Sequence, residues 1–160
     1  AVLGVRSQEL RTPGRTGWGE RTMAMWTLKK GDTIRRTLLH KQFGGGGQGG
    51  ISPCRRSPNI LIFSDYTEGE QHGYLDRWEG DTFLYVGEGQ VGDQQMIRGN
   101  KAILEHVEDG RPIRLFWGCR GEVTYGGEFR IDKDTPWSTE KATSKSGKMR
   151  NVIVFHLREV

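Results

Sequence analysis

The stretch FLYVGEGQVGDQQMIRGN, residues 83–100, joins an apolar run to three glycines spaced as G-x-G-x-x-G. In a dinucleotide-binding fold this spacing cradles phosphates, but the motif then opens a βαβ unit, and an acidic residue about 20 positions on holds the ribose. Here Val107 stands 20 positions after Gly87, and the 68 residues that follow Gly92 read as one strand after another. The stretch therefore favours a strand-rich fold in which glycines let the backbone approach a ligand closely.

The hydrophobic pattern on both sides of this stretch predicts a single α+β or β-barrel-like domain. Short apolar runs rich in β-branched residues are typical of buried strands. Asp93 is a candidate N-cap for one main helix that runs to about Val107. Strands are predicted over residues 59–63, 82–86, 111–118 and 151–157, and residues 122–132 are predicted to form two short strands or one strand bulged at Gly126-Gly127. A short basic helix or turn is predicted from Thr33 with Ile34, Leu38 and Leu39 on one face, and residues 132–149 are polar and loop-like.

Positive charge is concentrated at the start of the chain. Residues 1–58 carry 11 Lys and Arg against 3 Asp and Glu, whereas residues 59–160 carry 13 against 17. A basic first third fits a polyanionic partner such as nucleic acid, and a solvated basic arm explains the same charge equally well. Six of the seven residues 44–50 are glycine, and two arginines, Arg55 and Arg56, follow in a loop stiffened by two prolines. This loop would suit backbone phosphates, or it displays solvated arginines.

Several classes of protein are disfavoured by composition. No run of 18 apolar residues exists, so no membrane partner is expected, and the first residues lack the apolar core of a signal peptide. Cys54 and Cys119 have no C-x-x-C spacing, which favours two reduced thiols and a cytoplasmic location. Residues 1–22 mix Gly, Pro, Arg and Thr without apolar periodicity, so we predict a linker or an appended arm there and a domain over residues 23–160.

One tyrosine precedes the opening stretch and another lies within it, each near a glycine. Tyr74 lies in HGYLDRW and Tyr85 in FLYVG, and two such rings facing each other can hold a flat base. Asp76 lies two residues beyond Tyr74, so on a strand both side chains would share a face. A carboxylate beside stacked rings suits the amino edge of a base. The alternative is two core tyrosines and a surface aspartate.

Eight segments occur in one order between residues 44 and 160: GGIS, NILIF, GYLD, FLYVGEG, GDQQMIRGNKAIL, GRPIRLF, YGGEF and NVIVFHL. In this order they resemble the SRA (SET- and RING-associated, or YDG) domain, the family that reads modified cytosine in DNA. The chain is similar to bacterial members that precede an HNH nuclease domain in modification-dependent restriction enzymes. The resemblance implies a PUA-like fold, a twisted β-barrel or crescent sheet with one main helix and short flanking helices.

The resemblance also implies that a 5-methylcytosine-type base flips out of the duplex into a tyrosine-lined pocket. On the matching positions, Tyr74 and Tyr85 would stack on the base, and Asp76 would accept a hydrogen bond from its N4 amine. The backbone around Val86 and Gly87 would contact the polar edge of the base. These five residues form the predicted base pocket.

The implied partner is double-stranded DNA that carries modified cytosine. Animal members fill the gap left by the flipped base with a long finger loop, which has shrunk here to Gln90-Val91-Gly92. Candidates for filling the gap are therefore Gln90 and residues 52–57. The predicted DNA contacts are Lys41, Gln48, Ser52, Arg55, Arg56, Ser57, Gln90, Arg98 and Lys101.

We expect the chain to bind DNA without cutting it. Its four histidines are scattered, and no nucleophile elbow, H-E-x-x-H motif or HNH-like metal cluster appears, so neither a cofactor nor a metal is expected. A nuclease domain would belong to the parent protein, through which the domain could also dimerise. Two alternatives are a PUA-like module that binds RNA or unmodified nucleic acid without base flipping, and a nucleotide-dependent enzyme that uses the glycine motif.

Overall fold

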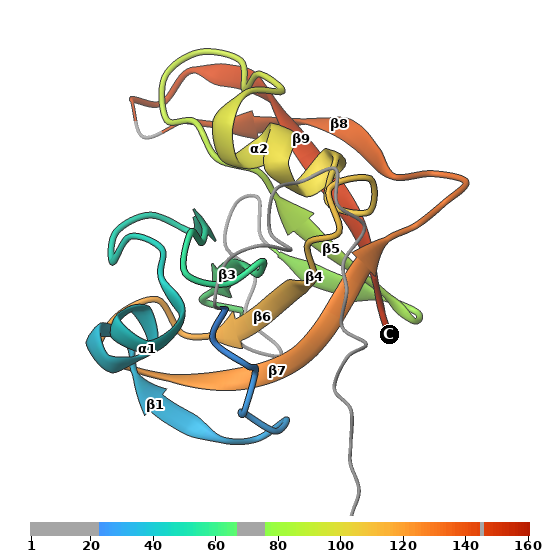
Figure 1. The fold of residues 1–160 in the computed structure, drawn as a ribbon. Coiled ribbons are helices and arrows are strands. Elements are labelled where there is room, and N and C mark those ends of the chain that lie inside the picture. The colour runs from blue at the N-terminus through green and yellow to red at the C-terminus, as the bar shows by residue number, and fades with distance from the viewer. Residues whose placement is uncertain (1–22, 67–75, 145) are drawn as a thin grey trace, which may run out of the picture.

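A computed structural model describes residues 23–66, 76–144 and 146–160. Within these ranges, nine strands form one mixed sheet, and one helix packs on each of its two faces (Figure 1). None of the helices in these ranges is long and apolar enough to cross a membrane. The elements are β1 (Thr33–Arg35), α1 (Arg36–Phe43), β2 (Ile51–Pro53), β3 (Ile60–Ser64), β4 (Arg77–Glu79), β5 (Thr82–Val86), α2 (Arg98–Leu104), β6 (Ile113–Trp117), β7 (Glu122–Ile131), β8 (Trp137–Thr143) and β9 (Met149–Glu159).

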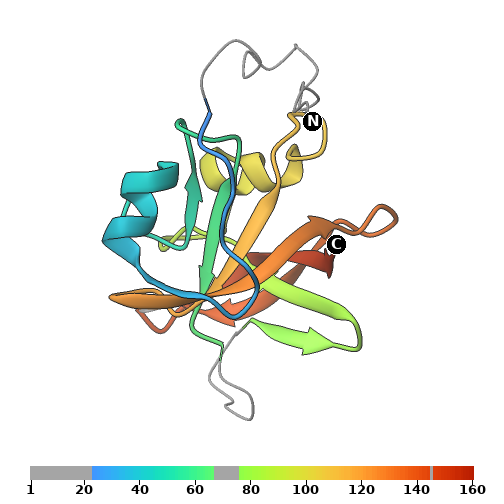
Figure 2. The ribbon, with the colours of Figure 1, turned by 60° about the horizontal axis from the view of Figure 1, so that its bottom comes forward.

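The main path of the sheet runs β2-β3-β6-β7-β9-β5-β4, with β1 paired to β7 and β8 paired to β9. Only β3 and β6 are parallel, and the remaining pairs are antiparallel. The sheet curves strongly without closing, so it forms the crescent of the predicted fold (Figure 2). The predicted bulge is present: Leu115 pairs with Gly127 and Phe116 with Tyr125, which leaves Gly126 as the extra residue on β7.

Two cores lie on opposite faces of the central strands. All five residues of β3 are buried, and because side chains alternate along a strand, Ile60 and Ile62 join one core while Leu61 and Phe63 join the other. Helix α2 closes the first core with Ile103, and helix α1 closes the second with Leu39 and Phe43. Residues Ile60 to Phe63 of this run are therefore all apolar, because β3 is covered on both faces.

Three predictions from the pattern were wrong. The main helix does not start at Asp93: α2 begins at Arg98 and is only 7 residues long, about as short as α1. Residues 132–149 are not all loop, because β8 lies within them and pairs along β9. Near Thr33 the chain first forms β1, which carries Ile34, and in α1 Leu39 is fully buried whereas Leu38 is 45% exposed.

Candidate base-binding pocket

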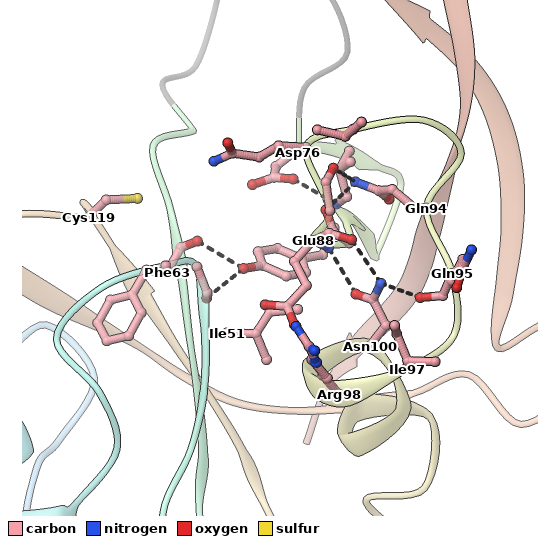
Figure 3. Close-up of a pocket in the computed structure, with 18 of the residues that line it drawn as sticks. Ile51, Phe63, Asp76, Glu88, Gln94, Gln95, Ile97, Arg98, Asn100 and Cys119 are labelled. Atoms are coloured by element: carbon pink, nitrogen blue, oxygen red, sulfur yellow. Dashed lines mark hydrogen bonds between the residues drawn. The ribbon is translucent and has the colours of Figure 1, made fainter. Parts of the chain in front are cut away.

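A cavity of about 840 Å³ opens where the ends of several elements meet (Figure 3). We call it the pocket. Its wall is built from the end of β5 and the loop after it, the start of α2, the last glycines before β2, and Asp76 just before β4. A volume of this size is in the range of sites that take a nucleotide-sized ligand. The crescent sheet places these separate chain ends around one opening.

Tyr85 lies in the wall of the pocket and is also part of the first core. Its side chain is 3% exposed, and its hydroxyl donates toward the carbonyl oxygens of Gly50 at 2.8 Å and Phe63 at 3.0 Å. Burial raises the pKa of this phenol well above its usual value, so it stays neutral. Tyr85 thereby ties the end of the glycine run to β3. The predicted partner ring, Tyr74, lies outside the described residues.

The Tyr85→Phe variant is expected to lower the free energy of unfolding by about 1 kcal/mol, because two carbonyl groups lose a shared donor. The ring remains, so any preference among DNA duplexes that depends on its face should persist. Urea unfolding and duplex titration of the same preparation measure the two effects. A variant with unchanged stability that has lost its duplex preference would contradict this division of roles.

Asp76 presents a carboxylate to the pocket from the residue before β4. Its Oδ1 accepts the Val86 backbone N–H at 2.8 Å, and its Oδ2 accepts the Ser64 hydroxyl at 2.5 Å. Burial raises the pKa of this carboxyl to about 6, and these two hydrogen bonds limit the rise. The group is therefore largely ionised at pH 7 and has lone pairs left for a donor inside the pocket.

The raised pKa of Asp76 predicts how stability depends on pH. Because the folded state holds this proton more tightly than the unfolded chain, the contribution is fully present below about pH 4 and is lost as the pH rises through 6. We expect the loss to be roughly 2 kcal/mol, less than the full shift implies, because the residue keeps some contact with water. Denaturant titrations of wild type and Asp76→Asn between these pH values measure it. A difference between the two proteins that does not change with pH would contradict the assignment.

The loop after β5 is held by a reciprocal set of hydrogen bonds that we call the Glu88–Asn100 clamp. Asn100 is 1% exposed; its Oδ1 accepts the Glu88 N–H at 2.9 Å, and its Nδ2 donates to the Glu88 and Gln95 carbonyls at 3.0 and 2.9 Å. In return, Glu88 Oε2 accepts the Gly99 N–H at 3.0 Å. A Cβ at Gly87 would lie 2.6 Å from Asn100 Oδ1, which is closer than real contacts allow. The first motif glycine is therefore needed for packing against the clamp.

The sequence reasoning missed this clamp, and it also misjudged how the following residues act. Asp93 does not cap a helix; its Oδ1 accepts the Asn151 N–H of β9 at 2.8 Å. Gln94 bridges the loop to β9, because its Nε2 donates to the Gly87 carbonyl and its Oε1 accepts the Ile153 N–H, each at 2.8 Å. Asp93 and Gln94 thus dock the loop onto β9. Hydrogen bonds between β9 and residues Asp93 and Gln94 hold this part of the chain on the sheet, and α2 begins only at Arg98.

Val86 and Gly87 border the pocket as predicted residues of the base site. The N–H of Val86 donates to Asp76, and the N–H of Gly87 donates to the Ile153 carbonyl at 2.8 Å. Both backbone donors are therefore occupied within the protein. A base in the pocket would meet the lone pairs of Asp76 rather than a free N–H of these two residues.

The predicted DNA contacts fall into three groups. Lys41, Arg55 and Arg56 are exposed around a second, shallower hollow beside the glycine run, and Gln48 is exposed within that run. Gln90 and Arg98 line the pocket, and Lys101 is exposed one turn further along α2. Ser52 and Ser57 are 3% and 0% exposed. Their hydroxyls donate to the carbonyls of Gly46 at 2.6 Å and Phe43 at 2.8 Å, so they stabilise the glycine loop from inside.

The glycine run is anchored by one buried arginine. Arg36 is 5% exposed and its guanidinium lies 3.7 Å from the centroid of the Phe63 ring. It donates to the carbonyls of Gly49 at 2.8 Å and Gly46 at 3.3 Å. Arg98 shows a different kind of constraint, because it is the one residue other than glycine with positive φ, 49°, in the described part of the chain. Its cation is held at the mouth of the pocket by an unusual backbone conformation.

Comparison with known proteins now bears on this geometry. A sequence model of the ScoMcrA-like SRA domain matches residues 30–160. No curated protein sequence matches the chain. A structure of the sulfur binding domain and SRA domain of ScoMcrA with phosphorothioated DNA superposes with a TM-score of 0.66 at 23% identity, over 84% of this chain and 40% of that one. The SRA domain of SUVH5 with hemi-methylated CG DNA superposes with a TM-score of 0.58 at 23% identity, over 88% and 94%.

These likenesses confirm the SRA fold. The chain spans about two fifths of the ScoMcrA fragment and 28% of the structure of ScoMcrA, a type IV phosphorothioation-dependent restriction endonuclease. It spans almost all of the SUVH5 domain, which has also been solved with fully hydroxymethylated CG DNA. In length and fold, this chain therefore corresponds to one part of a much larger protein in the first case and to a whole domain in the second.

Proposed function

Because this chain belongs to the ScoMcrA-like SRA domain family, we propose that it reads modified cytosine in double-stranded DNA by flipping the base into the pocket. The observation that carries the proposal is the half-buried carboxylate of Asp76 beside the wall formed by Tyr85. A carboxylate at this position accepts a hydrogen bond from the N4 amine of cytosine, whereas thymine has an acceptor oxygen, O4, at the corresponding ring position. Tyr85 bounds the space that a flat ring would occupy, and Tyr74 is the proposed second ring.

The energies of such a reaction set the size of the expected preference. Flipping costs a few kcal/mol of stacking and pairing, stacking on aromatic rings returns about 1 to 3 kcal/mol, and a charged hydrogen bond adds about 1.5 to 3 kcal/mol. One buried methyl group contributes only about 0.8 kcal/mol. The modification itself should therefore change affinity by roughly tenfold at most, and phosphate contacts must supply much of the remainder. Lys41, Arg55, Arg56 and Arg98 are exposed where they can make such contacts.

We further propose that the domain is the targeting module of a modification-dependent restriction endonuclease and does not itself cut DNA. The described residues offer a binding pocket with a carboxylate and no nucleophile poised beside it: both thiols are free, and burial raises the pKa of Cys54 to about 11 and of Cys119 to about 12. The likeness to part of ScoMcrA supports a larger parent protein. An HNH nuclease domain and a dimer would belong to that parent.

Titration of the chain with duplexes of one sequence tests the function. The duplexes carry cytosine, 5-methylcytosine, 5-hydroxymethylcytosine or a phosphorothioate linkage, and a matched RNA duplex is included. We expect 5-methylcytosine to raise affinity by about fourfold over cytosine at physiological salt, because one buried methyl group contributes about 0.8 kcal/mol. Equal affinities for all DNA duplexes would reject the reader, and tighter binding of RNA would favour the alternative PUA-like module. A preference confined to the phosphorothioate would reject base reading in favour of backbone reading.

A further inference from the structure

One buried cation in the pocket is not explained by anything in the fold. Arg150 lies near the start of β9 and lines the pocket, yet the residue is only 7% exposed. Arginine is rarely buried without a partner, because its charge loses hydration. Its surroundings therefore show whether the protein itself supplies compensation.

The protein compensates one edge of this guanidinium only. Nη1 donates to the carbonyl oxygens of Gly89 at 2.5 Å and Gly92 at 3.2 Å. Nε is buried and has no hydrogen-bond partner among the described residues. Two carbonyl groups on one nitrogen leave the edge formed by Nε and Nη2 without an acceptor that the structure shows.

The charge is also unbalanced within the described ranges, where Arg150 makes no ion pair. Four carboxylates share the pocket wall, those of Asp65, Asp76, Glu88 and Asp93, and none of them forms an ion pair with Arg150 in the described part of the chain. Asp93 accepts from Asn151, Glu88 accepts from Gly99, and Asp76 accepts from Val86 and Ser64. A buried ion without a counter-ion costs several kcal/mol. An anion that enters the pocket would recover much of that cost.

We propose that Arg150 binds a phosphodiester group that flanks the flipped nucleotide, an inference that rests on the proposed function. The Nε–Nη2 edge of a guanidinium offers two parallel N–H groups that match two oxygens of a phosphate. A nucleotide whose base lies beside Asp76 and Tyr85 brings its own phosphates to the same cavity. The shared chemistry is a phosphate oxyanion, and the duplex is the source that delivers it together with a base.

The same guanidinium connects phosphate binding to the loop at the rim. The carbonyls that it holds bracket Gln90 and Val91, and Val91 is 93% exposed. Gly89 and Gly92 both have positive φ, 125° and 68°, a conformation that glycine adopts without strain. A phosphate that draws Arg150 toward the pocket therefore moves this turn and its two tip residues with it.

A scan with single neutral methylphosphonate linkages around a 5-methylcytosine tests the assignment. Wild type should lose about tenfold in affinity at one flanking linkage, because a charge-assisted contact is removed. Arg150→Gln should bind the duplex without a methylphosphonate about tenfold more weakly than wild type does, and its affinity should not change at that linkage. The slope of its log affinity against log salt concentration should be shallower by about one. Arg35→Gln, a change at an exposed arginine of β1, is the matched control and should keep the sensitivity.

Groups in contact must show coupling, so that the loss of affinity in the double change is smaller than the product of the two single losses. If the losses from the variant and from the linkage simply multiply at every position, the proposal is overturned. If Arg150→Gln does not fold, Arg150→Lys takes its place and should lose most of the linkage sensitivity, because an ammonium lacks the paired donors. If millimolar inorganic phosphate stabilises wild type but not the variant, beyond an equal ionic strength of chloride, and no linkage of the duplex shows coupling, the assignment to DNA is overturned. Coupling at one linkage without any preference for modified cytosine would reject the proposed reader and keep this phosphate site.

Discussion

Asp76→Asn is expected to abolish the preference for modified cytosine and to lower affinity for the modified duplex to that of the unmodified one, a loss of about fourfold and of roughly tenfold at most. The amide keeps an oxygen for the Val86 N–H, so the strand end should stay in place. It presents an N–H where the cytosine amine needs an acceptor, and two donors then face each other in a confined site. Titrations of wild type and variant with 5-methylcytosine and cytosine duplexes give the ratio.

The background affinity for unmodified DNA should change little, because Lys41, Arg55 and Arg56 are untouched. Asp76→Glu serves as a second variant that keeps the charge while moving it by one methylene. A variant Asp76→Asn that still prefers the modified duplex, with wild-type stability near neutral pH, would show that the base is recognised elsewhere. It would leave the fold assignment intact, because that rests on the family match and the superpositions.

Asn100→Ala is expected to lower the free energy of unfolding by about 4 kcal/mol. The truncation leaves the Glu88 N–H and the Glu88 and Gln95 carbonyls without their partner, each at a cost of about 1 to 3 kcal/mol when buried. Because water reaches part of the loop, the summed cost of the three groups should lie near the lower end of this range. Urea unfolding followed by tryptophan fluorescence measures it.

The loss of the clamp should also weaken binding of the modified duplex, because the loop 88–97 forms one wall of the pocket. Asn59→Ala is the matched control: Asn59 is 2% exposed and bonds Ser57 and Arg114 away from the pocket. It should lower stability without changing the preference among duplexes. If both variants change the preference equally once corrected for folded fraction, the clamp has no special part in shaping the pocket.

The elements that the sequence predicted correctly are those with a strong apolar pattern. β3, β5, β6 and β9 have buried runs, and the double glycine in β7 marked its bulge. β8 escaped prediction because Ala142 is its only buried residue, so its sequence shows no hydrophobic alternation. Backbone pairing with β9 holds this strand in the sheet. The shortened α2 escaped prediction because Asp93 and Gln94 exchange hydrogen bonds with residues of β9, far along the chain.

The site was predictable in type and only partly in detail. The resemblance placed Asp76, Tyr85 and the loop glycines in one region, and the structure brings these residues to one pocket. Asn100 and Arg150 carry no local signal, because their roles depend on partners 12 and about 60 positions away. Ser52 and Ser57 look like solvent-facing loop residues until the burial of their hydroxyls is seen. Tyr74 keeps the role that the resemblance gives it as a prediction.

The left-handed backbone at Arg98 has a consequence for attempts to raise the thermal stability of this domain. A side chain other than glycine in that conformation costs about 1 to 2 kcal/mol, so a screen for heat resistance would readily select glycine at position 98. The same exchange removes a cation from the rim where DNA would approach. A variant selected for thermal stability alone would thus be expected to bind DNA more weakly.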